Sequence, residues 1–328
     1  MTRSLSDWLD AVAGKRILVW GDLVADHTVY GDTRRISREA PVLILKKEWE
    51  GIAPGCAGNA VMNVSALGGT PVPVGIVGDD AAGESLLSQF TEHGVDVSHI
   101  LRQKDGETAV KMRVLAGGLH TVKQQVIRID SDGSYGSLGD GQIEGRLRET
   151  LEVADAVIVS DYGLGTVREL LFTKLIRRRS LPSVIDSRHA LDRFGGATSA
   201  TPNEPELEEL TRVSVGDEDD MLERAARKVL RELQLKALVV TRGKRGMALF
   251  EPRKRRVHIP VSRVREIVDV TGAGDTVIAA YTLALAAGAP YPEAARLANV
   301  AAGVAVMKRG AVAPSASEVA EALQDSRG

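Results

Sequence analysis

The sequence contains almost no cysteine: Cys56 is the only one among 328 residues. A single thiol cannot form an internal disulfide or build a cysteine-based metal site, and this fits a reducing compartment. The six histidines are scattered along the chain, so no Cys/His cluster shows the spacing of metal ligands.

An excess of one charge and long apolar runs are also absent. Lys and Arg number 42 against 44 Asp and Glu, so net charge gives no support for binding nucleic acid or a membrane surface. No run approaches the roughly 18 apolar residues that span a bilayer. Residues 1–15 carry Arg3, Asp7 and Asp10, and we expect neither a signal peptide nor a membrane anchor there. A soluble, cytoplasmic protein is expected.

Two nucleotide-binding signatures are missing as well. No Gly-x-x-x-x-Gly-Lys-Ser/Thr loop is present, which argues against a P-loop enzyme. No Gly-x-Gly-x-x-Gly follows the first predicted strand, which argues against a dinucleotide-binding dehydrogenase.

The most informative stretch present is Asp269–Asp275, which reads Asp-Val-Thr-Gly-Ala-Gly-Asp before an alanine-rich apolar run. It predicts a tight turn and a buried helix over 273–287. Gly272, Ala273 and Gly274 are small enough for an anion to approach the unpaired N–H groups of the helix start. A carboxylate at Asp275 suits the removal of a proton from an attacking hydroxyl, although it could also simply cap the helix.

Short apolar strands alternate with helices through much of the chain. Strands are predicted at 16–20, 156–160, 183–185 and 237–241, and each is followed by polar residues. This alternation predicts an α/β fold with a doubly wound, mostly parallel sheet whose carboxyl edge binds ligands. Asp22 and Asp26, after the first strand, are candidates for binding hydroxyl groups or for a turn and a cap. Asn59 likewise caps a helix or reaches a substrate hydroxyl.

Two polar patches do not fit the centre of a parallel sheet, which favours unbroken apolar strands. Strands at 28–30 and 42–45 flank a polar loop at 31–39, and further strands are predicted at 109–114 and 124–129. We expect residues of about 27–48 and 106–130 to form a small β lid within a single domain of residues 1–328. Because one face of such a lid is not buried by its own domain, a homodimer formed lid to lid is expected.

Three motifs together resemble a known family. Asp269–Asp275 resembles the C-terminal signature of the ribokinase-like (PfkB) carbohydrate kinases, and Asn203-x-x-Glu206 resembles their magnesium-associated motif. The run from Pro54 through Gly55 to Asn59 is similar to their Gly-rich substrate motif. The resemblance covers nearly the whole chain. Within the family, segments 35–42, 111–114, 124–130, 160–163 and 269–310 look most similar to the heptose 7-phosphate kinases of ADP-heptose synthesis.

The resemblance implies ATP-dependent phosphorylation of the anomeric hydroxyl of D-glycero-D-manno-heptose 7-phosphate. Asp275 would be the general base, beside the N–H groups of Gly272, Ala273 and Gly274. Asn203 and Glu206 would organise Mg²⁺ through water. The remaining residues expected at the ATP pocket are Thr241, Gly243, Gly246 and Asn299. Those expected to bind the sugar are Asp22, Gly55 and Asn59. Candidate cations for its phosphate are Lys111, Arg113 and Arg128 from the lid and Arg188 from the main sheet, and each of them could equally be a solvated surface charge.

Several positions differ from the usual heptose kinase pattern. They are Arg38, Cys56, Gly58 and the segment 186–189. A kinase for another sugar or sugar phosphate is therefore an alternative, and a monovalent-cation requirement is left open. A non-catalytic, ligand-binding descendant of the fold is a third reading, against which the intact Asp275 and its two flanking glycines argue.

Overall fold

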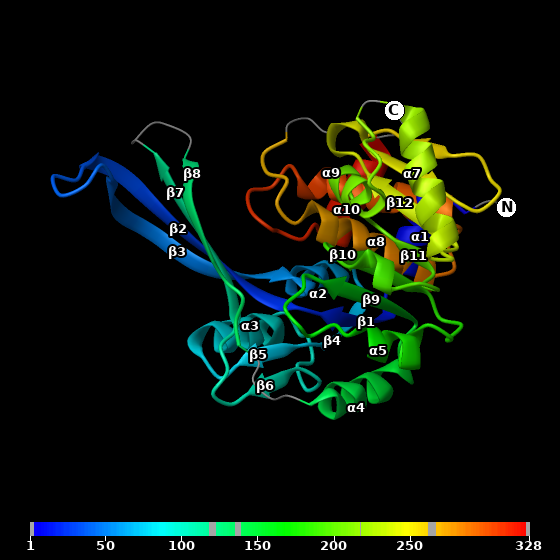
Figure 1. Ribbon diagram of the computed structural model, residues 1–328, viewed down its shortest axis with the longest axis horizontal. Helices are drawn as coiled ribbons and strands as arrows, with labels where there is room; N and C mark the ends of the chain where they lie inside the picture. Colours follow the sequence, from blue (N-terminus) through cyan, green and yellow to red (C-terminus); the bar gives the residue numbers. More distant parts are fainter. Residues whose placement is uncertain (1–2, 118–122, 135–138, 217, 262–266, 326–328) are drawn as a thin grey trace.

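A computed structural model describes residues 3–117, 123–134, 139–216, 218–261 and 267–325. Its main sheet has eight strands in the order β14-β13-β12-β11-β10-β9-β1-β4 (Figure 1). All neighbouring pairs are parallel except β12–β13 and β13–β14. The strands are β1 (Arg16–Gly21), β4 (Thr70–Val74), β9 (Ala156–Asp161), β10 (Ser183–Ser187), β11 (Ser199–Ala200), β12 (Ala237–Thr241), β13 (Met247–Phe250) and β14 (Val257–Ile259). The prediction of a mostly parallel sheet is confirmed.

Helices cover both faces of this sheet, because successive side chains of each strand point to opposite sides. In β1, Ile17 and Val19 belong to one hydrophobic cluster, whereas Leu18 and Trp20 belong to another. The first cluster draws on α1 (Leu5–Ala11), α2 (Ala57–Ala66), α3 (Ala81–Glu92), α8 (Ala273–Ala286), α9 (Tyr291–Ala305) and α10 (Ala316–Asp325). The second draws on α4 (Asp140–Leu151), α5 (Glu169–Leu171) with the π-helical turn Phe172–Ile176, α6 (Glu204–Thr211) and α7 (Asp219–Glu232). The predicted doubly wound α/β architecture is therefore present.

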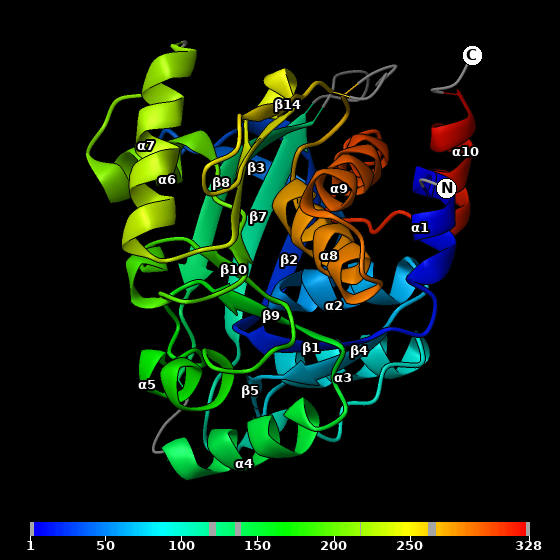
Figure 2. The same cartoon turned by 90° about the vertical axis from the view of Figure 1, so that its right-hand side faces the viewer.

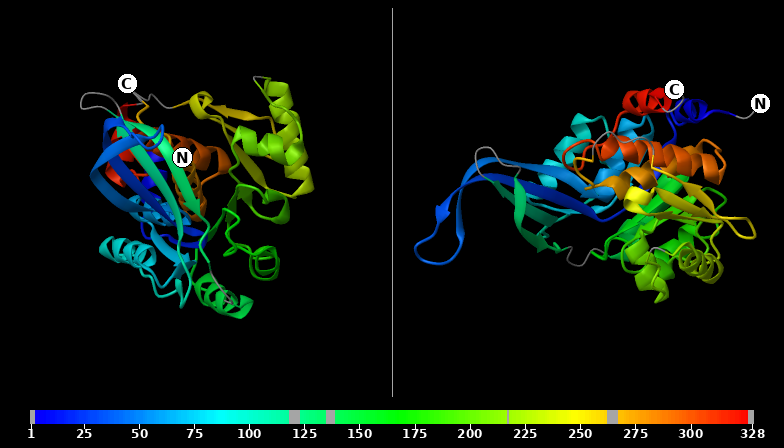
Figure 3. Two further views of the ribbon diagram at one scale, coloured as in Figure 1. Left: turned by 60° about the vertical axis from the view of Figure 1, so that its left-hand side comes forward. Right: turned by 90° about the horizontal axis from the view of Figure 1, so that it is seen from above.

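A second, four-stranded sheet projects from this body (Figures 1 and 3). Its order is β3 (Leu43–Cys56), β2 (Leu23–Ile36), β7 (Ala109–Gly117) and β8 (Gln124–Ser131), with only β2 and β7 parallel. A separate parallel pair consists of β5 (Ile76–Gly78) and β6 (Leu101–Gln103). Residues 118–122, within the predicted lid, lie outside the described residues.

The projecting sheet is longer than the sequence predicted. Most of the predicted loop at 31–39 belongs to β2, and residues 53–56 form the end of β3, directly before α2 begins at Ala57. The turn-forming residues Gly31 and Asp32 stay in the strand because two register shifts, at Tyr30/Gly31 and at Thr33/Arg35, absorb the irregularity. Pairing along β3 thus overrides the local turn preference.

The carboxyl edge of the main sheet is where polar groups from distant segments meet. Ser187 at the end of β10 donates a hydrogen bond to Asp161 at the end of β9 (2.7 Å), and Asn59 of α2 contacts Asp275 of α8. Both chain ends lie elsewhere, where α1 packs beside α10 (Figure 2). No helix in the described ranges has the length and apolar character needed to cross a membrane.

Candidate active site

The Gly-Ala-Gly-Asp turn opens α8 as the sequence predicts. Gly272 is the N-cap residue with φ 77°, and an added Cβ there would overlap the Nδ2 atom of Asn59. Glycine is therefore required both by the left-handed backbone and by the close approach of α2. The N–H of Ala273 already donates to the Val270 carbonyl (3.2 Å). In the described part of the chain, the N–H of Gly274 has no such partner and stays available for an anion.

Asp275 lies in the first turn of α8, and its side chain is held from two sides. It is 7% exposed. The Nδ2 of Asn59 donates to Oδ2 (2.8 Å), and the Tyr162 hydroxyl donates to Oδ1 (3.2 Å). Asn59 is itself buried, and its amide nitrogen is used by Asp275, so the structure gives it the role of positioning this carboxylate instead of the predicted contact with a sugar hydroxyl.

A chain of buried hydrogen bonds fixes the amide of Asn59. The Thr276 hydroxyl donates to Oδ1 of Asn63 (2.8 Å), and Nδ2 of Asn63 donates to Oδ1 of Asn59 (3.1 Å). Because Oδ1 of Asn59 is thus occupied by a donor, its Nδ2 must face Asp275. Sequence reasoning missed Asn63, Thr276 and Tyr162. Asn63 could have been found from its spacing, because it lies four residues after Asn59 and therefore on the same face of the helix.

Burial is the main cause that raises the pKa of Asp275 to about 7. The charge of Asp26 raises it further, whereas the hydrogen bonds from Asn59 and Tyr162 and the charge of Lys111 lower it. A general base works best when its pKa lies near the working pH, because it is then both unprotonated and able to hold a proton. The environment of Asp275 therefore suits proton removal from a hydroxyl near neutral pH.

Asp22 has a different role from the predicted one. Its side chain is 0% exposed, and its carboxylate accepts N–H groups from Tyr162 (2.8 Å), Leu164 (3.2 Å) and Thr166 (3.1 Å). Burial raises the pKa of Asp22. With both carboxylate oxygens enclosed and bonded, Asp22 cannot reach a sugar and instead holds the loop that carries Tyr162. The turn role considered for this residue is the one observed.

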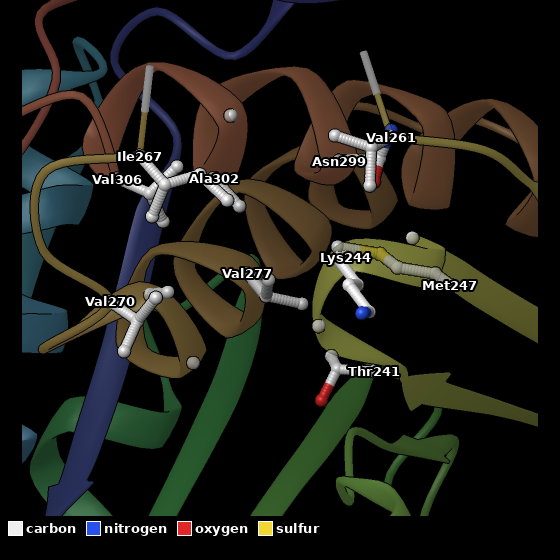
Figure 4. Close-up of a pocket in the computed structure, with 15 residues that line it drawn as sticks. Thr241, Lys244, Met247, Val261, Ile267, Val270, Val277, Asn299, Ala302 and Val306 are labelled. Atoms are coloured by element: carbon white, nitrogen blue, oxygen red, sulfur yellow. The ribbon is translucent and has the colours of Figure 1, made fainter. Parts of the chain in front are cut away.

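An apolar cavity of about 190 Å³ opens beside the first turn of α8 (Figure 4). It brings together four residues expected at the ATP pocket, namely Thr241, Gly243, Gly246 and Asn299. Gly246 has φ 79°, and an added Cβ would overlap the carbonyl oxygen of Ile259. Asn299 donates from Nδ2 to the Pro260 carbonyl (2.8 Å), so it also anchors the cavity wall.

Most of the cavity wall was not predicted from the sequence. The lining includes Met247, Val261, Ile267, Val270, Val277, Ala302 and Val306 (Figure 4). These side chains come from β13, from the loops on both sides of residues 262–266, from α8 and α9, and from Val306 just after α9. An apolar slot that ends at the free N–H of Gly274 fits a flat aromatic base with a phosphate chain attached.

Asn203 and Glu206 form the N-terminal capping box of α6. The N–H of Glu206 donates to Oδ1 of Asn203 (2.8 Å), and the N–H of Asn203 donates to Oε2 of Glu206 (2.9 Å). Burial raises the pKa of Glu206, and it raises the pKa of Asp186 well above its usual range, with the nearby charge of Glu206 adding to the effect. Asn203 does not line the apolar cavity but pairs with Thr241, which does.

This donor set fits a weakly held Mg²⁺. Over the residues described, no three His, Cys, Asp or Glu side chains converge closely enough to hold a metal ion directly. Carboxylate and amide oxygens are hard ligands, and Mg²⁺ in kinase sites keeps several waters and binds the phosphates of the nucleotide. Asn203 and Glu206 are thus suited to hold the ion through water.

A second cavity, of about 410 Å³, lies between the projecting sheet and the loops next to α8 and α9. Asp26 and Arg113 line it from the sheet and form an ion pair (2.8 Å). Gly55 lies directly behind Asp26, since an added Cβ would come within 2.7 Å of the Asp26 carboxyl carbon. The described structure therefore places Asp26, rather than Asp22, where a substrate can reach it.

The four candidate cations do not converge on this cavity. Only Arg113 lines it. Nζ of Lys111 lies 3.0 Å from Sγ of Cys56 and 4.6 Å from the centre of the Tyr162 ring, deeper in the fold. Arg128 makes a two-pronged ion pair with its neighbour Asp130 (2.7 and 2.6 Å).

Arg188 lies at a separate cavity of about 150 Å³, which it lines together with Glu206. Arg188 is on the main sheet, as expected, but it does not line the 410 Å³ cavity where the phosphate of the sugar was expected to meet it. Its backbone N–H bonds to the Asp161 carbonyl at the end of β9, which keeps it on the main sheet next to the carboxylate expected to organise Mg²⁺.

The model of the pfkB family of carbohydrate kinases matches residues 15–318 of this sequence. The chain belongs to that family. As a pfkB-family member it is an ATP-dependent carbohydrate kinase.

Curated relatives of this kinase include two proteins named Bifunctional protein HldE. The one from Geobacter sulfurreducens is 39% identical over 98% of the chain, and the one from Hahella chejuensis is 36% identical over 95%. The chain spans 66% and 64% of their respective lengths.

Solved structures confirm the fold of the kinase. Arabidopsis thaliana ribokinase complexed with ribose and ATP has a TM-score of 0.77 at 21% identity, covering 95% of this chain and 99% of its own. Escherichia coli phosphofructokinase-2 in complex with fructose-6-phosphate has a TM-score of 0.78 at 20% identity, covering 96% and 100%. Both likenesses concern the fold alone.

Proposed function

We propose that this kinase transfers the γ-phosphoryl group of ATP to the anomeric hydroxyl of D-glycero-D-manno-heptose 7-phosphate, giving the 1,7-bisphosphate on the way to ADP-heptose. The observation that carries the proposal is Asp275, a buried carboxylate with a pKa of about 7 that lies beside an apolar cavity and near a second cavity lined by Asp26 and Arg113. The choice of sugar is supported by the resemblance of segments 111–114, 124–130 and 160–163 to heptose 7-phosphate kinases, and by the HldE relatives.

In the proposed reaction, Asp275 accepts the proton of the anomeric hydroxyl while that oxygen forms a bond to the γ-phosphorus. The bond from this phosphorus to the β–γ bridging oxygen breaks, and ADP leaves with the electron pair. The free N–H of Gly274 and the positive end of α8 stabilise the charge on the transferred group. Asn59 and Tyr162 keep the carboxylate of Asp275 aimed at the hydroxyl.

Mg²⁺, when bound, neutralises charge on the phosphates of the nucleotide. Asn203 and Glu206 would hold it through water, with their capping box keeping both side chains in place before the ion arrives. Arg188, beside Glu206, would add a positive charge on the nucleotide side rather than at the sugar.

We also propose that the projecting sheet is the lid of a single kinase domain and the contact surface of a cytoplasmic homodimer. All eight residues of β8 are exposed, and Ile127 and Ile129, two residues apart, point to the same side of the sheet. Two exposed apolar side chains on an edge strand are covered when a second copy packs against them.

Light scattering tests the dimer. The chain mass is 35.0 kDa, so a dimer has twice that, about 70 kDa. We expect the double variant Ile127→Lys/Ile129→Lys to be monomeric, and Val153→Lys, an equally exposed position on the body, to remain dimeric. A wild-type protein that is monomeric at micromolar concentration would contradict the proposal.

The test of the reaction is ATP consumption with Mg²⁺ on a panel of sugars, with and without K⁺. The panel contains the heptose 7-phosphate, sedoheptulose 7-phosphate, fructose 6-phosphate, ribose and fructose. Turnover confined to the heptose 7-phosphate supports the proposal, whereas turnover only on another sugar replaces it with a different substrate for the same kinase. We expect Asp275→Asn to abolish turnover while ATP still binds, and near wild-type kcat in this variant would refute the base assignment.

A further inference from the structure

Arg309 lies on the loop that follows α9, opposite the projecting sheet. It lines the 410 Å³ cavity together with Asp26 and Arg113. It lies outside the three motifs that carry the family resemblance. Its position raises the question of what a free guanidinium does at the sugar side of the kinase.

The two carboxylates of this cavity are already in use. Asp26 is paired with Arg113 (2.8 Å). Asp269 accepts the N–H of Thr271 (2.9 Å) and the N–H of Gly310 (3.0 Å). Across the described ranges, Arg309 has neither an ion pair nor a side-chain hydrogen bond, and it is exposed to the cavity. An anion entering there meets a guanidinium whose hydrogen-bond donors are free.

The loop that carries Arg309 is fixed to the catalytic turn. Asp269 joins the two segments, because one of its oxygens holds the turn at Thr271 and the other holds Gly310, next to Arg309. Two residues further on, Ala311 lies close enough to the turn that a Cβ on Gly272 would come within 3.1 Å of its Cβ. Arg309 therefore has a defined place relative to the reacting centre.

We propose that Arg309 binds the phosphate group that the sugar substrate already carries, and so makes this kinase specific for a phosphorylated sugar. The inference rests on the proposed function. The planar guanidinium donates two parallel hydrogen bonds to a phosphate, which a lysine cannot do. Arg113 approaches the same cavity from the sheet, so a phosphate bound between the two arginines links the body to the projecting sheet.

The three other cations considered for this phosphate are less suited to it. Lys111 is engaged with Cys56 and Tyr162, Arg128 is paired with Asp130 through two hydrogen bonds, and Arg188 lies at a different cavity. Arg309 is the cation in the lining of this cavity that needs no existing partner to be displaced.

The experiment compares Arg309→Gln, Arg309→Lys and the control Arg224→Gln, which removes the same charge from an exposed position on α7. Steady-state kinetics are measured with the heptose 7-phosphate and with the same heptose lacking the phosphate. We expect Arg309→Gln to raise KM for the phosphorylated sugar about tenfold to a hundredfold, as for loss of a charge-assisted hydrogen bond, with kcat and KM for ATP within about twofold. Arg309→Lys recovers part of this loss, and Arg224→Gln behaves as the wild type.

An equal rise of KM for both sugars, or no rise at all, overturns the inference. Calorimetric binding of the 7-phosphate, in the presence of a non-hydrolysable ATP analogue, provides a readout that needs no turnover. Tighter binding to the wild type than to Arg309→Gln supports the role of Arg309, whereas equal affinity or no binding to either overturns it. A wild type that phosphorylates a different phosphorylated sugar refutes only the proposed heptose, and the comparison is then decided with that sugar.

Discussion

Replacing Tyr162 with Phe tests how the protein sets the pKa of its base. The Tyr162 hydroxyl donates to Oδ1 of Asp275 at 3.2 Å and favours the charged carboxylate, so its removal raises the pKa of Asp275 above about 7. A hydrogen bond to a charged group contributes about 1.5–3 kcal/mol, and one pKa unit corresponds to about 1.36 kcal/mol. The long donor–acceptor distance places this bond at the weak end of that range, so we expect a rise of about one unit.

The sign of the effect on activity follows from the role of the base. Only unprotonated Asp275 accepts a proton, so activity is lost as the pH falls through its pKa. The acid limb of the kcat/KM profile should move from near pH 7 to roughly pH 8 in Tyr162→Phe. At pH 6.5 the variant should therefore be roughly tenfold slower than the wild type, whereas at pH 9 the two should be nearly equal.

A coupled ATP assay across this pH range measures the limb, and Tyr281→Phe is the matched control. Tyr281 is a buried tyrosine on α8 whose hydroxyl meets Oγ of Ser199 (3.2 Å) rather than Asp275, so its removal should leave the limb in place. Phenylalanine at position 162 also keeps the ring under Lys111. An unmoved limb, or a loss of activity that is equal at all pH values, would refute the reasoning.

Four further predictions concern the framework of the site. Gly272→Ala places a side chain at φ 77° and against Asn59, so we expect it to lower Tm, with the backbone alone costing about 1–2 kcal/mol. In Gly274→Ala the added Cβ meets no atom within 4 Å, so we expect Tm to be unchanged. We expect kcat to fall, because the methyl group fills the space in front of the free N–H of residue 274. Thermal melting and steady-state kinetics distinguish this variant from Gly272→Ala. Asp22→Asn should reduce the free energy of unfolding in urea by about 1–3 kcal/mol, because it loses the charged acceptor of three backbone N–H groups. Asn63→Ala should lower kcat with little change in KM for ATP, and an unchanged kcat would show that Asn59 needs no second amide to orient it.

Local sequence patterns were sufficient to predict those elements whose residues interact mainly with their neighbours in the sequence. The turn and helix at Gly272–Asp275 were predictable because glycine spacing and an apolar run act within a few residues. The central strands were predictable because strands buried on both faces must be apolar throughout. The length of β2 could not be predicted, because its polar residues stay extended only through pairing with β3, and that pairing is not visible in the local sequence.

The roles of the site residues were also not predictable where they depend on contacts between distant parts of the sequence. Asp22 and Asp26 are both acidic and lie four positions apart, and nothing local shows that the first is enclosed by the loop after β9. Tyr162 and Asn63 act on Asp275 from more than a hundred residues away in sequence, directly or through Asn59. Arg188 was expected on the main sheet and Arg113 on the lid, but only the tertiary structure shows that the two arginines line different cavities.

The environment of Cys56 has a practical consequence for measuring motion of the projecting sheet. The thiolate is the species that alkylating reagents attack, and burial raises the pKa of this thiol to about 12, so almost none is present at neutral pH. Because it is the only cysteine of the chain, the native background to maleimide labelling should be close to zero. A cysteine introduced at Ile36, which is 65% exposed, would then carry a single probe, and its fluorescence would report directly whether sugar, nucleotide or both move the sheet toward the body.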